Sequence, residues 1–309
     1  MLYRPGICLH DVPAPAKINL FLHVVGRRED GYHLLQTAFQ FLDLADTLHF
    51  DLRTDGRIVL QDATAGVKHD DNLVVRAARN LQAACGTTLG ADIRLEKRIP
   101  MGGGLGGGSS DAASTLIALN RLWNAGLDRQ ALMRLGLVLG ADVPVFLFGD
   151  NAFAEGVGEK LQALVLPPRV YLVLRPGVSI PTVEIFSAKD LTRDSERIIM
   201  AFFSEMTKTN EGNISEFGRN DLETVAFSRY PAVRQVAEWM SEEGFPVRMS
   251  GSGSCLFGEF HDLDKAVLAE RKFAAKMRAV QFPGNGEAAP VETYVCRGLS
   301  EHPLKQWVV

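Results

Sequence analysis

The amino-acid sequence predicts an α+β fold built in two parts. Segments with the alternation of strands and segments with the periodicity of helices are mixed along the 309 residues, without the strict strand–helix–strand order that a parallel sheet requires. The length is enough for two domains, and a stretch near Leu161–Arg169 separates two runs of such segments. We therefore expect one domain over 1–162 and a second over 163–309.

The first part is predicted to begin with strands. The segment Ala16–Val25 alternates as a strand does, "GRREDGYH" is typical of a turn, and Leu34–Leu52 indicates further extended structure. The later elements are a strand at 56–62, a helix at 70–86, a strand at 91–100, helices at 109–126 and 128–140, and a hairpin at 151–164. We expect Asp70 or Asp71 to cap the first of these helices and Gly86 to end it.

The second part is predicted to repeat this mixture. Its expected elements are a strand at 167–177, a turn and helix at 179–191, helices at 220–244 with a proline interruption, a strand–turn–strand unit at 246–260, a helix at 262–280 and a strand at 289–299. The polar segments 206–218 and 283–290 are predicted as loops.

Composition and charge restrict the function. The net charge of −4 and the pI of about 6.0 give no basic excess that would bind nucleic acid or an anionic membrane. The four cysteines form no CxxC pair, so their spacing indicates neither a zinc nor a redox motif, and we expect reduced thiols. The N-terminus does not resemble a signal peptide, and no apolar run reaches the roughly 20 residues of a membrane span. We expect a cytoplasmic protein.

The most informative segment is "PMGGGLGGGSSDAAS", Pro100–Ser114, which has six glycines between 102 and 108. Glycine weakens an element interior by roughly 0.5–1 kcal/mol relative to alanine, so the run needs a reason. It precedes a predicted helix whose first turn holds Ser109, Ser110 and Asp111. The unpaired N–H groups and positive dipole end of a helix attract anions, and glycines let the backbone wrap a ligand closely. The run therefore predicts a phosphate-binding loop.

Two familiar phosphate loops fit this run less well. The Walker A pattern GxxxxGK[ST] can be laid on Gly103–Ser110, but Ser109 then stands where lysine is required. The dinucleotide pattern GxGxxG matches Gly102, Gly104 and Gly107, although such a match is nearly automatic in a glycine run. The preceding strand is charged and alternating, unlike the first strand of a dinucleotide-binding fold. A flexible linker or a crowded packing site is the remaining alternative.

The loop resembles that of the GHMP kinases, the superfamily of galactokinase, homoserine kinase, mevalonate kinase and phosphomevalonate kinase. Four further segments extend the resemblance over essentially the whole chain and are similar to the branch that phosphorylates a cytidyl-linked substrate. They are "PAPAKINLFLHVVGRREDGYHLLQT", "LGADVPVFL", "PGVSIPTVEIF" and "RMSGSGSCLFGEF". The resemblance implies an N-terminal ribosomal-protein-S5-like domain that binds ATP and a C-terminal ferredoxin-like domain that binds the substrate.

The reaction implied by the resemblance is transfer of the ATP γ-phosphate to the 2-hydroxyl of 4-diphosphocytidyl-2-C-methyl-D-erythritol, in the non-mevalonate (MEP) isoprenoid pathway. Mg²⁺ would accompany ATP, and the serine hydroxyls are possible contacts, but the sequence does not identify its ligands. The residues that the resemblance assigns to ATP are Asn72, Lys97, Pro100, Met101, Gly102, Gly103, Gly104, Leu105, Gly106, Gly107, Gly108, Ser109 and Ser110.

Two residues match the catalytic lysine and aspartate of the family. They are Lys17, in an apolar strand, and Asp142, between apolar residues. Taken alone, the lysine would be expected to reach water and the aspartate to cap a helix. By the resemblance, Asp142 accepts the proton of the substrate hydroxyl, and Lys17 orients Asp142 and offsets developing charge. Asn19, two residues further along the strand, would bind the erythritol part.

The resemblance also implies a site for the base. Tyr32 and Phe186 would enclose the cytosine ring, and His33 would hydrogen-bond its edge; without the resemblance, Tyr32 would be an anchor of its polar turn. "GSGS" at Gly251–Ser254 is either a tight hairpin turn or a third family motif that faces the first loop. "NDLE" at Asn220–Glu223 is expected to start a helix.

Other functions remain open at this stage. A different kinase of the family would need no base site, and a nucleotide-binding module without catalysis would need neither Lys17 nor Asp142. A nucleic-acid-binding protein would need a basic surface that the charge balance does not indicate. We expect a small-molecule substrate and either a monomer or a homodimer.

Overall fold

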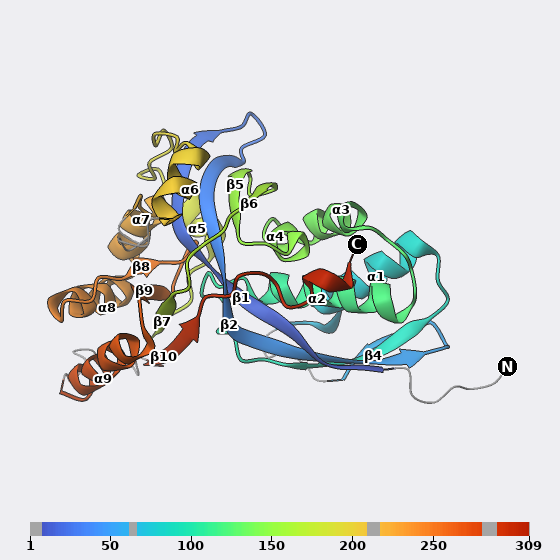
Figure 1. Ribbon diagram of the computed structural model, residues 1–309. Helices are drawn as coiled ribbons and strands as arrows, with labels where there is room; N and C mark the ends of the chain where they lie inside the picture. The colour runs from blue at the N-terminus through green and yellow to red at the C-terminus, as the bar shows by residue number, and fades with distance from the viewer. Residues whose placement is uncertain (1–7, 62–66, 209–216, 280–288, 309) are drawn as a thin grey trace.

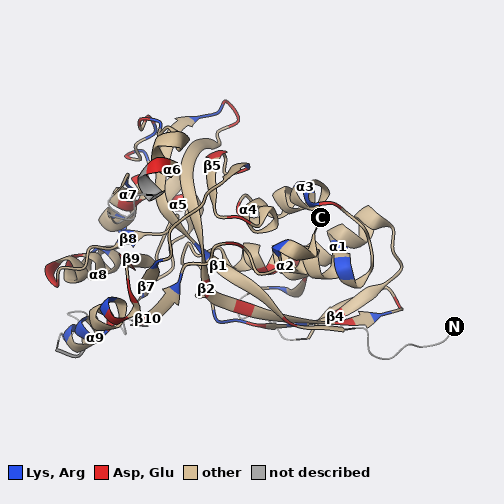
Figure 2. Ribbon diagram, in the orientation of Figure 1, with Lys and Arg blue, Asp and Glu red and all other residues tan. Residues whose placement is uncertain are grey.

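The computed structural model describes residues 8–61, 67–208, 217–279 and 289–308, and in it the expected α+β fold in two parts is confirmed (Figure 1). Two sheets, each accompanied by helices, lie toward opposite ends of the molecule. Lys and Arg are interspersed with Asp and Glu along the described ribbon, as Figure 2 shows. Among the described residues, no helix has both the length and the apolar character needed to cross a membrane.

The first sheet is built on a long hairpin. Strand β1 (Cys8–Arg27) pairs antiparallel with β2 (His33–Arg53) through the expected turn. Four further strands complete the sheet: β3 (Ile58–Leu60), β4 (Gly90–Glu96), β5 (Ala152–Gly156) and β6 (Lys160–Ala163). The other edge of β2 pairs with β4 at one end of the strand and with β5 at the other end. Beyond them, β3 lies beside β4, and β6 lies beside β5.

Helices cover one face of this first sheet (Figure 1). They are α1 (Leu73–Cys85), α2 (Gly107–Leu122), α3 (Arg129–Leu139) and α4 (Val143–Phe148). The α2 helix is buried on nearly all sides from Ser110 onward, because it packs between α1, α4 and the sheet. Its small residues permit these close approaches, and its first turn faces the centre of the molecule.

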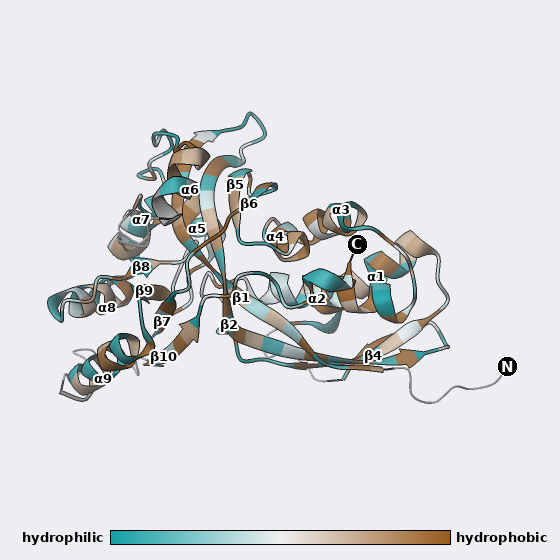
Figure 3. Ribbon diagram, in the orientation of Figure 1, coloured by the Kyte–Doolittle hydropathy of each residue, from teal (hydrophilic) through white to brown (hydrophobic). Residues whose placement is uncertain are grey.

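The second sheet has the ferredoxin-like arrangement that the resemblance implied. Its strands are β7 (Val170–Gly177), β8 (Arg248–Met249), β9 (Leu256–Phe260) and β10 (Ala289–Arg297), in the spatial order β10-β7-β9-β8 and all antiparallel. Its helices are α5 (Thr182–Phe186), α7 (Asp221–Arg229), α8 (Pro231–Glu242) and α9 (Leu263–Ala279). Figure 3 shows hydrophobic and hydrophilic residues alternating on α9, as expected for a helix with one face on a core.

Strand β1 connects the two parts through their interiors. Its residues from Ala14 to Val24 are all buried, as is Val12. Val12 belongs to the core beneath α1 and α2, Ile18 to a central core, and Leu22 to the core of the second part. Since a strand buried on both faces is held rigidly, a side chain at its middle is fixed relative to both parts.

Two local predictions were wrong. The first helix is capped not by Asp70 or Asp71 but by Asn72, whose Oδ1 accepts the backbone N–H of Val74 at 2.9 Å, while His69–Asp71 forms a separate 3-10 turn. The predicted loop at 206–218 begins inside an unexpected helix, α6 (Met200–Lys208). The rest of that loop up to 216, and most of the loop predicted at 283–290, lies outside the described residues.

The C-terminal residues return to the first part of the molecule. Gly298 forms a bridge with Leu42, and Glu301 forms one with Asp150. Further on, the Leu304 and Val308 side chains enter the core beneath α1 and α2. The segment after β10 therefore packs against the first sheet and its helices, although it follows the second sheet in the sequence.

His302 is the buried polar residue of this returning segment. Its ring centre lies 5.7 Å from that of Phe41 and 6.4 Å from that of Phe146, and its Nδ1 accepts the N–H of Leu304 at 3.1 Å. Burial, with a smaller effect of Arg129, lowers the pKa of His302 to about 3. The imidazole is therefore neutral in the native protein throughout the neutral range.

Replacing His302 with Leu is expected to reduce the acid sensitivity of the fold. In the unfolded chain the histidine takes up a proton near its ordinary pKa of 6.5, so the native state loses about 1.4 kcal/mol of stability per pH unit as the pH falls below that value. Urea unfolding at pH 7.5, 6.5 and 5.5 measures this slope, with the exposed His261→Leu as the matched control. An equal slope in wild type and His302→Leu would contradict the assignment.

Candidate active site

Two pockets meet at the glycine loop. The first, the loop pocket, has a volume of about 420 Å³ and lies between this loop and the start of α1. The second, the central pocket, has a volume of about 720 Å³ and lies between the β1–β2 hairpin and the second part of the molecule. Gly102, Gly104 and Ser109 line both pockets, so ligands in the two pockets can meet across the loop.

Two glycines show why the loop cannot carry a side chain at certain positions. Gly104 has a φ of +76°, and a Cβ there would lie 2.0 Å from the backbone oxygen of Ser250. Gly106 has a φ of +73°, and its Cβ would lie 3.0 Å from the side chains of Lys17 and Phe146. The close packing that the sequence left as an alternative is therefore present, and the same loop also lines two pockets.

The loop leads directly into α2. Gly106 occupies the N-cap position, and no side chain caps the helix among the described residues, which leaves N–H groups of the first turn open to a ligand. Of the residues predicted to bind ATP, Asn72, Lys97 and the run from Pro100 to Ser109 line the loop pocket. Ser110 does not; it is buried, and its hydroxyl has no hydrogen-bond partner in the described part of the chain.

Lys97 is held in the loop-pocket wall by two buried carboxylates. Its Nζ donates to Asp46 and, at 2.7 Å, to Asp111. Asp46 also accepts the backbone N–H groups of Arg98 at 2.5 Å and Ile99 at 2.8 Å. Burial raises the pKa of Asp111 to about 7, although the charge of Lys97 opposes the shift. The charge of Lys97 is thus offset within the protein, and its position is fixed.

The predicted catalytic pair is in contact in the central pocket. Lys17 is buried on β1, and its Nζ lies 3.3 Å from Oδ2 of Asp142, a side chain that is 40% exposed at the start of α4. The same Nζ donates to Oδ1 of Asn19 at 2.7 Å and lies 5.3 Å from the ring centre of Phe39. Asp142 makes no side-chain capping hydrogen bond to α4. The lysine does not reach water, and the aspartate is free to face a ligand.

The residues predicted to bind the base line the same pocket. The ring centres of His33 and Phe186 are 5.2 Å apart, and Tyr32 beside them is 66% exposed in its turn. Nε of Arg193 donates to Nε2 of His33 at 3.1 Å, and Arg193 is itself anchored on backbone oxygens such as that of Leu191, at 2.9 Å. Burial and the positive charge of Arg193 lower the pKa of His33.

Sequence reasoning missed the residues that position these groups. Arg193 stands in a polar stretch with no motif that marks it. Ser250 precedes the "GSGS" motif; its Oγ accepts the N–H of Asn19 at 3.2 Å and donates to the oxygen of Gly104 at 3.0 Å. Cys255 donates its N–H to the oxygen of Gly103 at 3.1 Å. The third motif therefore does face the first loop, as the resemblance implied.

Comparison with known proteins agrees with this geometry. Residues 72–150 match the model of the GHMP kinases N terminal domain, and residues 205–279 match that of the GHMP kinases C terminal domain. The chain is 58% identical over 301 residues to the 4-diphosphocytidyl-2-C-methyl-D-erythritol kinase of Bordetella parapertussis, with 97% of this chain and 99% of the relative covered. The enzyme of that name from Aromatoleum aromaticum is 52% identical, with 97% of each chain covered.

Solved structures show the same relationship. A crystal structure of 4-(cytidine 5′-diphospho)-2C-methyl-D-erythritol kinase is 37% identical and superposes with a TM-score of 0.74, covering 93% of this chain and 98% of the other. Homoserine kinase from Cytophaga hutchinsonii superposes with a TM-score of 0.70 at 15% identity, covering 98% of each chain. The second likeness extends to the fold alone.

Proposed function

Since this chain belongs to the GHMP kinase family and matches its 4-diphosphocytidyl-2-C-methyl-D-erythritol kinases along nearly its whole length, we propose a division of the reaction between its two pockets. The chain is an ATP-dependent kinase that phosphorylates the 2-hydroxyl of that substrate, in the non-mevalonate route to isoprenoid precursors. ATP occupies the loop pocket and the cytidyl substrate the central pocket. The shared wall of the two pockets is the observation that carries this division.

Asp142 and Lys17 act on the acceptor hydroxyl in the central pocket. The Asp142 carboxylate accepts the hydroxyl proton as the substrate oxygen bonds to the γ-phosphorus and the bond from that phosphorus to the bridging oxygen of ADP breaks. Lys17, 3.3 Å from Asp142, orients the carboxylate and offsets negative charge on the transferred group. Asn19, which accepts a hydrogen bond from Lys17, lies where it can also bind the erythritol part.

The base is recognised at the other end of the central pocket. Tyr32 and Phe186 stack on its two faces, and His33 binds its edge. Because a guanidinium only donates, the bond from Arg193 makes Nε2 of His33 an acceptor. The neutral ring then carries its proton on Nδ1, which can donate to an acceptor on the base. The ring nitrogen N3 of cytosine is such an acceptor, whereas N3 of uracil carries hydrogen.

The part of the site that holds ATP, the phosphate donor, has side chains that suit Mg²⁺. Ser109 lies at the junction of the pockets, and the neighbouring Ser110 Oγ is a buried hydroxyl without a partner in the described residues. Hydroxyl oxygens are among the hard ligands that Mg²⁺ accepts together with phosphates and water. Ser109 and Ser110 would hold the ion, which when bound would neutralise charge on the ATP phosphates.

We also assign the two halves of the chain. Residues 1–162 supply the lining of the loop pocket and are the ATP-binding domain, and residues 163–309 contribute the Phe186 side of the central pocket and are the substrate-binding domain. The charge balance of −4 and the free cysteines support a cytoplasmic protein, monomeric or homodimeric, that does not bind nucleic acid.

The test is a substrate comparison with the purified chain. ATP, Mg²⁺ and 4-diphosphocytidyl-2-C-methyl-D-erythritol are supplied, and ADP release and product are followed by phosphorus NMR, with homoserine and mevalonate in parallel. We expect a new phosphomonoester on the cytidyl substrate alone. Phosphorylation of another alcohol instead would retain the role of the glycine loop and exclude the base site.

A further inference from the structure

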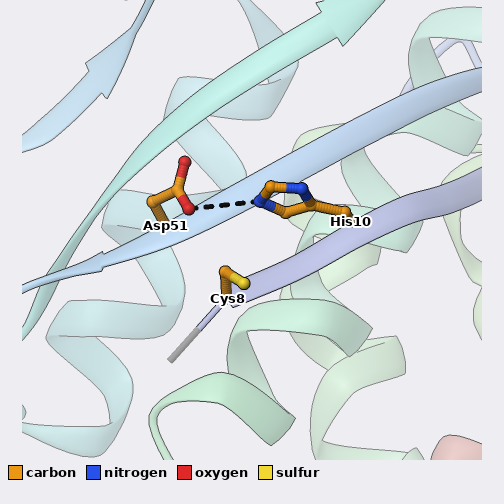
Figure 4. Close-up of side chains that lie close together, drawn as sticks. All are labelled: Cys8, His10 and Asp51. Atoms are coloured by element: carbon orange, nitrogen blue, oxygen red, sulfur yellow. Dashed lines mark hydrogen bonds and ion pairs between the residues drawn. The ribbon is translucent and has the colours of Figure 1, made fainter. Parts of the chain in front are cut away.

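Three side chains with metal-binding atoms gather at the outer end of the β1–β2 hairpin. Figure 4 shows Cys8 and His10 on β1 and Asp51 on β2, with a hydrogen bond joining His10 to Asp51 and the Cys8 side chain beside this pair. All three side chains are exposed, and none of them lines the loop pocket or the central pocket. The cluster therefore has no part in the kinase site described above.

The strand geometry explains why these residues meet. Side chains two residues apart point to the same face of a strand, which places Cys8 and His10 together. Asp51 lies directly opposite Cys8 in the β1–β2 register, and such cross-strand pairs have Cβ atoms about 4.5–5.5 Å apart. No linear metal-binding motif results, because the ligands come from two strands that are far apart in the sequence.

A bulge in β1 holds the histidine in place. The register shifts between Leu9 and Val12, and the N–H of Asp11 in this bulge donates to Nδ1 of His49 at 3.2 Å. The ring of His49 packs edge-on against that of His10, with centres 5.4 Å apart. Packing of this kind restricts the orientation of a ligand ring before the metal arrives.

The separations fit one small metal ion. Nε2 of His10 lies 3.2 Å from Oδ1 of Asp51, and one ligand atom from each of the three residues lies within 4.8 Å of the others. In a tetrahedral zinc site the ligand atoms are about 3.3–3.7 Å apart, because the metal–ligand bonds are about 2.0–2.3 Å long. The His10–Asp51 pair is thus within about 0.1 Å of the required distance, and the exposed Cys8 side chain would turn toward this pair to supply the third ligand.

We propose that Cys8, His10 and Asp51 form a zinc-binding site, with water in the fourth position. Thiolate, imidazole and carboxylate together suit Zn²⁺, whereas Mg²⁺ and Ca²⁺ select sites built from oxygen atoms alone. Binding converts the Cys8 thiol to a thiolate, and the proton leaves to solvent. The site is separate from the Mg²⁺ that accompanies ATP.

The test measures zinc binding by the full chain in competition with a chromophoric chelator, with millimolar Mg²⁺ present. We expect one zinc ion per chain, and at least a tenfold loss of affinity in each of Cys8→Ser, His10→Ala and Asp51→Asn, since even changes beyond the ligands cost about 10–100-fold in metal sites. Cys85→Ser and His261→Ala are the matched controls and should retain wild-type affinity. Kinase activity should be unchanged in all five variants.

Two further measurements test directly whether Cys8 binds the metal. Co²⁺ in place of Zn²⁺ should give thiolate-to-metal charge-transfer absorption that Cys8→Ser lacks, and Zn²⁺ should protect Cys8, but not Cys85, from alkylation by iodoacetamide. Binding only at millimolar zinc would overturn the proposal. Stoichiometric binding that survives Cys8→Ser and Asp51→Asn would overturn it equally, because the metal would then lie elsewhere.

Discussion

Asp142→Asn is expected to lower kcat by about 10²–10⁴-fold, the usual contribution of a general base, while KM for ATP changes little. The asparagine has nearly the same shape but cannot accept the hydroxyl proton. Asp142 is 40% exposed and makes no capping hydrogen bond, and asparagine keeps an oxygen that can face Lys17, so the fold should tolerate the change. Steady-state kinetics with both substrates, together with thermal unfolding, measure the two effects separately.

The control for this change is Glu238→Gln, which removes a carboxylate from the exposed face of α8 and should leave kcat unchanged.

Lys17→Met is the companion variant. If Asp142 acts through its bond with Lys17, the two single changes and the double change should cost similar factors, since residues that act as a unit are not additive. Near-normal kcat in Asp142→Asn with a raised KM for the cytidyl substrate would show that Asp142 only positions the acceptor.

The features that the sequence predicted are those encoded locally. The hairpin around the turn before His33 follows from alternation over neighbouring residues. The glycine loop lies between a strand and a helix, and its glycine content together with that position suggested an anion site. Lys17 and Asp142 carry no local signal of chemistry, because a lysine in a strand and an aspartate before an apolar turn are common surface features. The resemblance to a family was needed to single them out.

The features that the sequence did not predict depend on contacts between distant segments. Lys97 alternates as an exposed strand residue would, and nothing near it marks Asp46, some fifty residues earlier, as its partner. Arg193 fixes a histidine that is 160 residues away in the sequence. Cys8 and Asp51, which we propose as zinc ligands, are brought together by the register of two strands. Such pairs depend on tertiary packing, which periodicity over a short window does not report.

The cap of α1 shows a smaller failure of the same kind. Asp70, Asp71 and Asn72 are all good N-cap residues, so composition could not choose among them. The choice is made by the 3-10 turn at His69–Asp71, which places the extended backbone of Asn72 at the helix start. That position also brings Asn72 into the wall of the loop pocket, where the resemblance assigned it.

Phe186→Ala is expected to raise KM for the cytidyl substrate by about 5–150-fold, which corresponds to the roughly 1–3 kcal/mol of one stacked base, while KM for ATP changes less than about twofold. Phe186 lies at the end of α5 with its ring 5.2 Å from that of His33. Steady-state kinetics with each substrate varied in turn measure the split. Phe202→Ala, an exposed phenylalanine on α6, is the matched control. Equal changes in both KM values would count against the stacking role.

Kinetics with a cytidyl and a uridyl substrate distinguish recognition of the face of the base from recognition of its edge. Every base has a face on which an aromatic ring can stack, so Phe186→Ala should weaken both substrates and preserve the preference for cytidyl. Arg193→Met removes the donor that makes Nε2 of His33 an acceptor, and the ring can then present either nitrogen as donor or acceptor. The preference should fall in this variant, although the stacking residues are intact. If Arg193→Met leaves the preference unchanged, the edge of the base is recognised by groups other than His33.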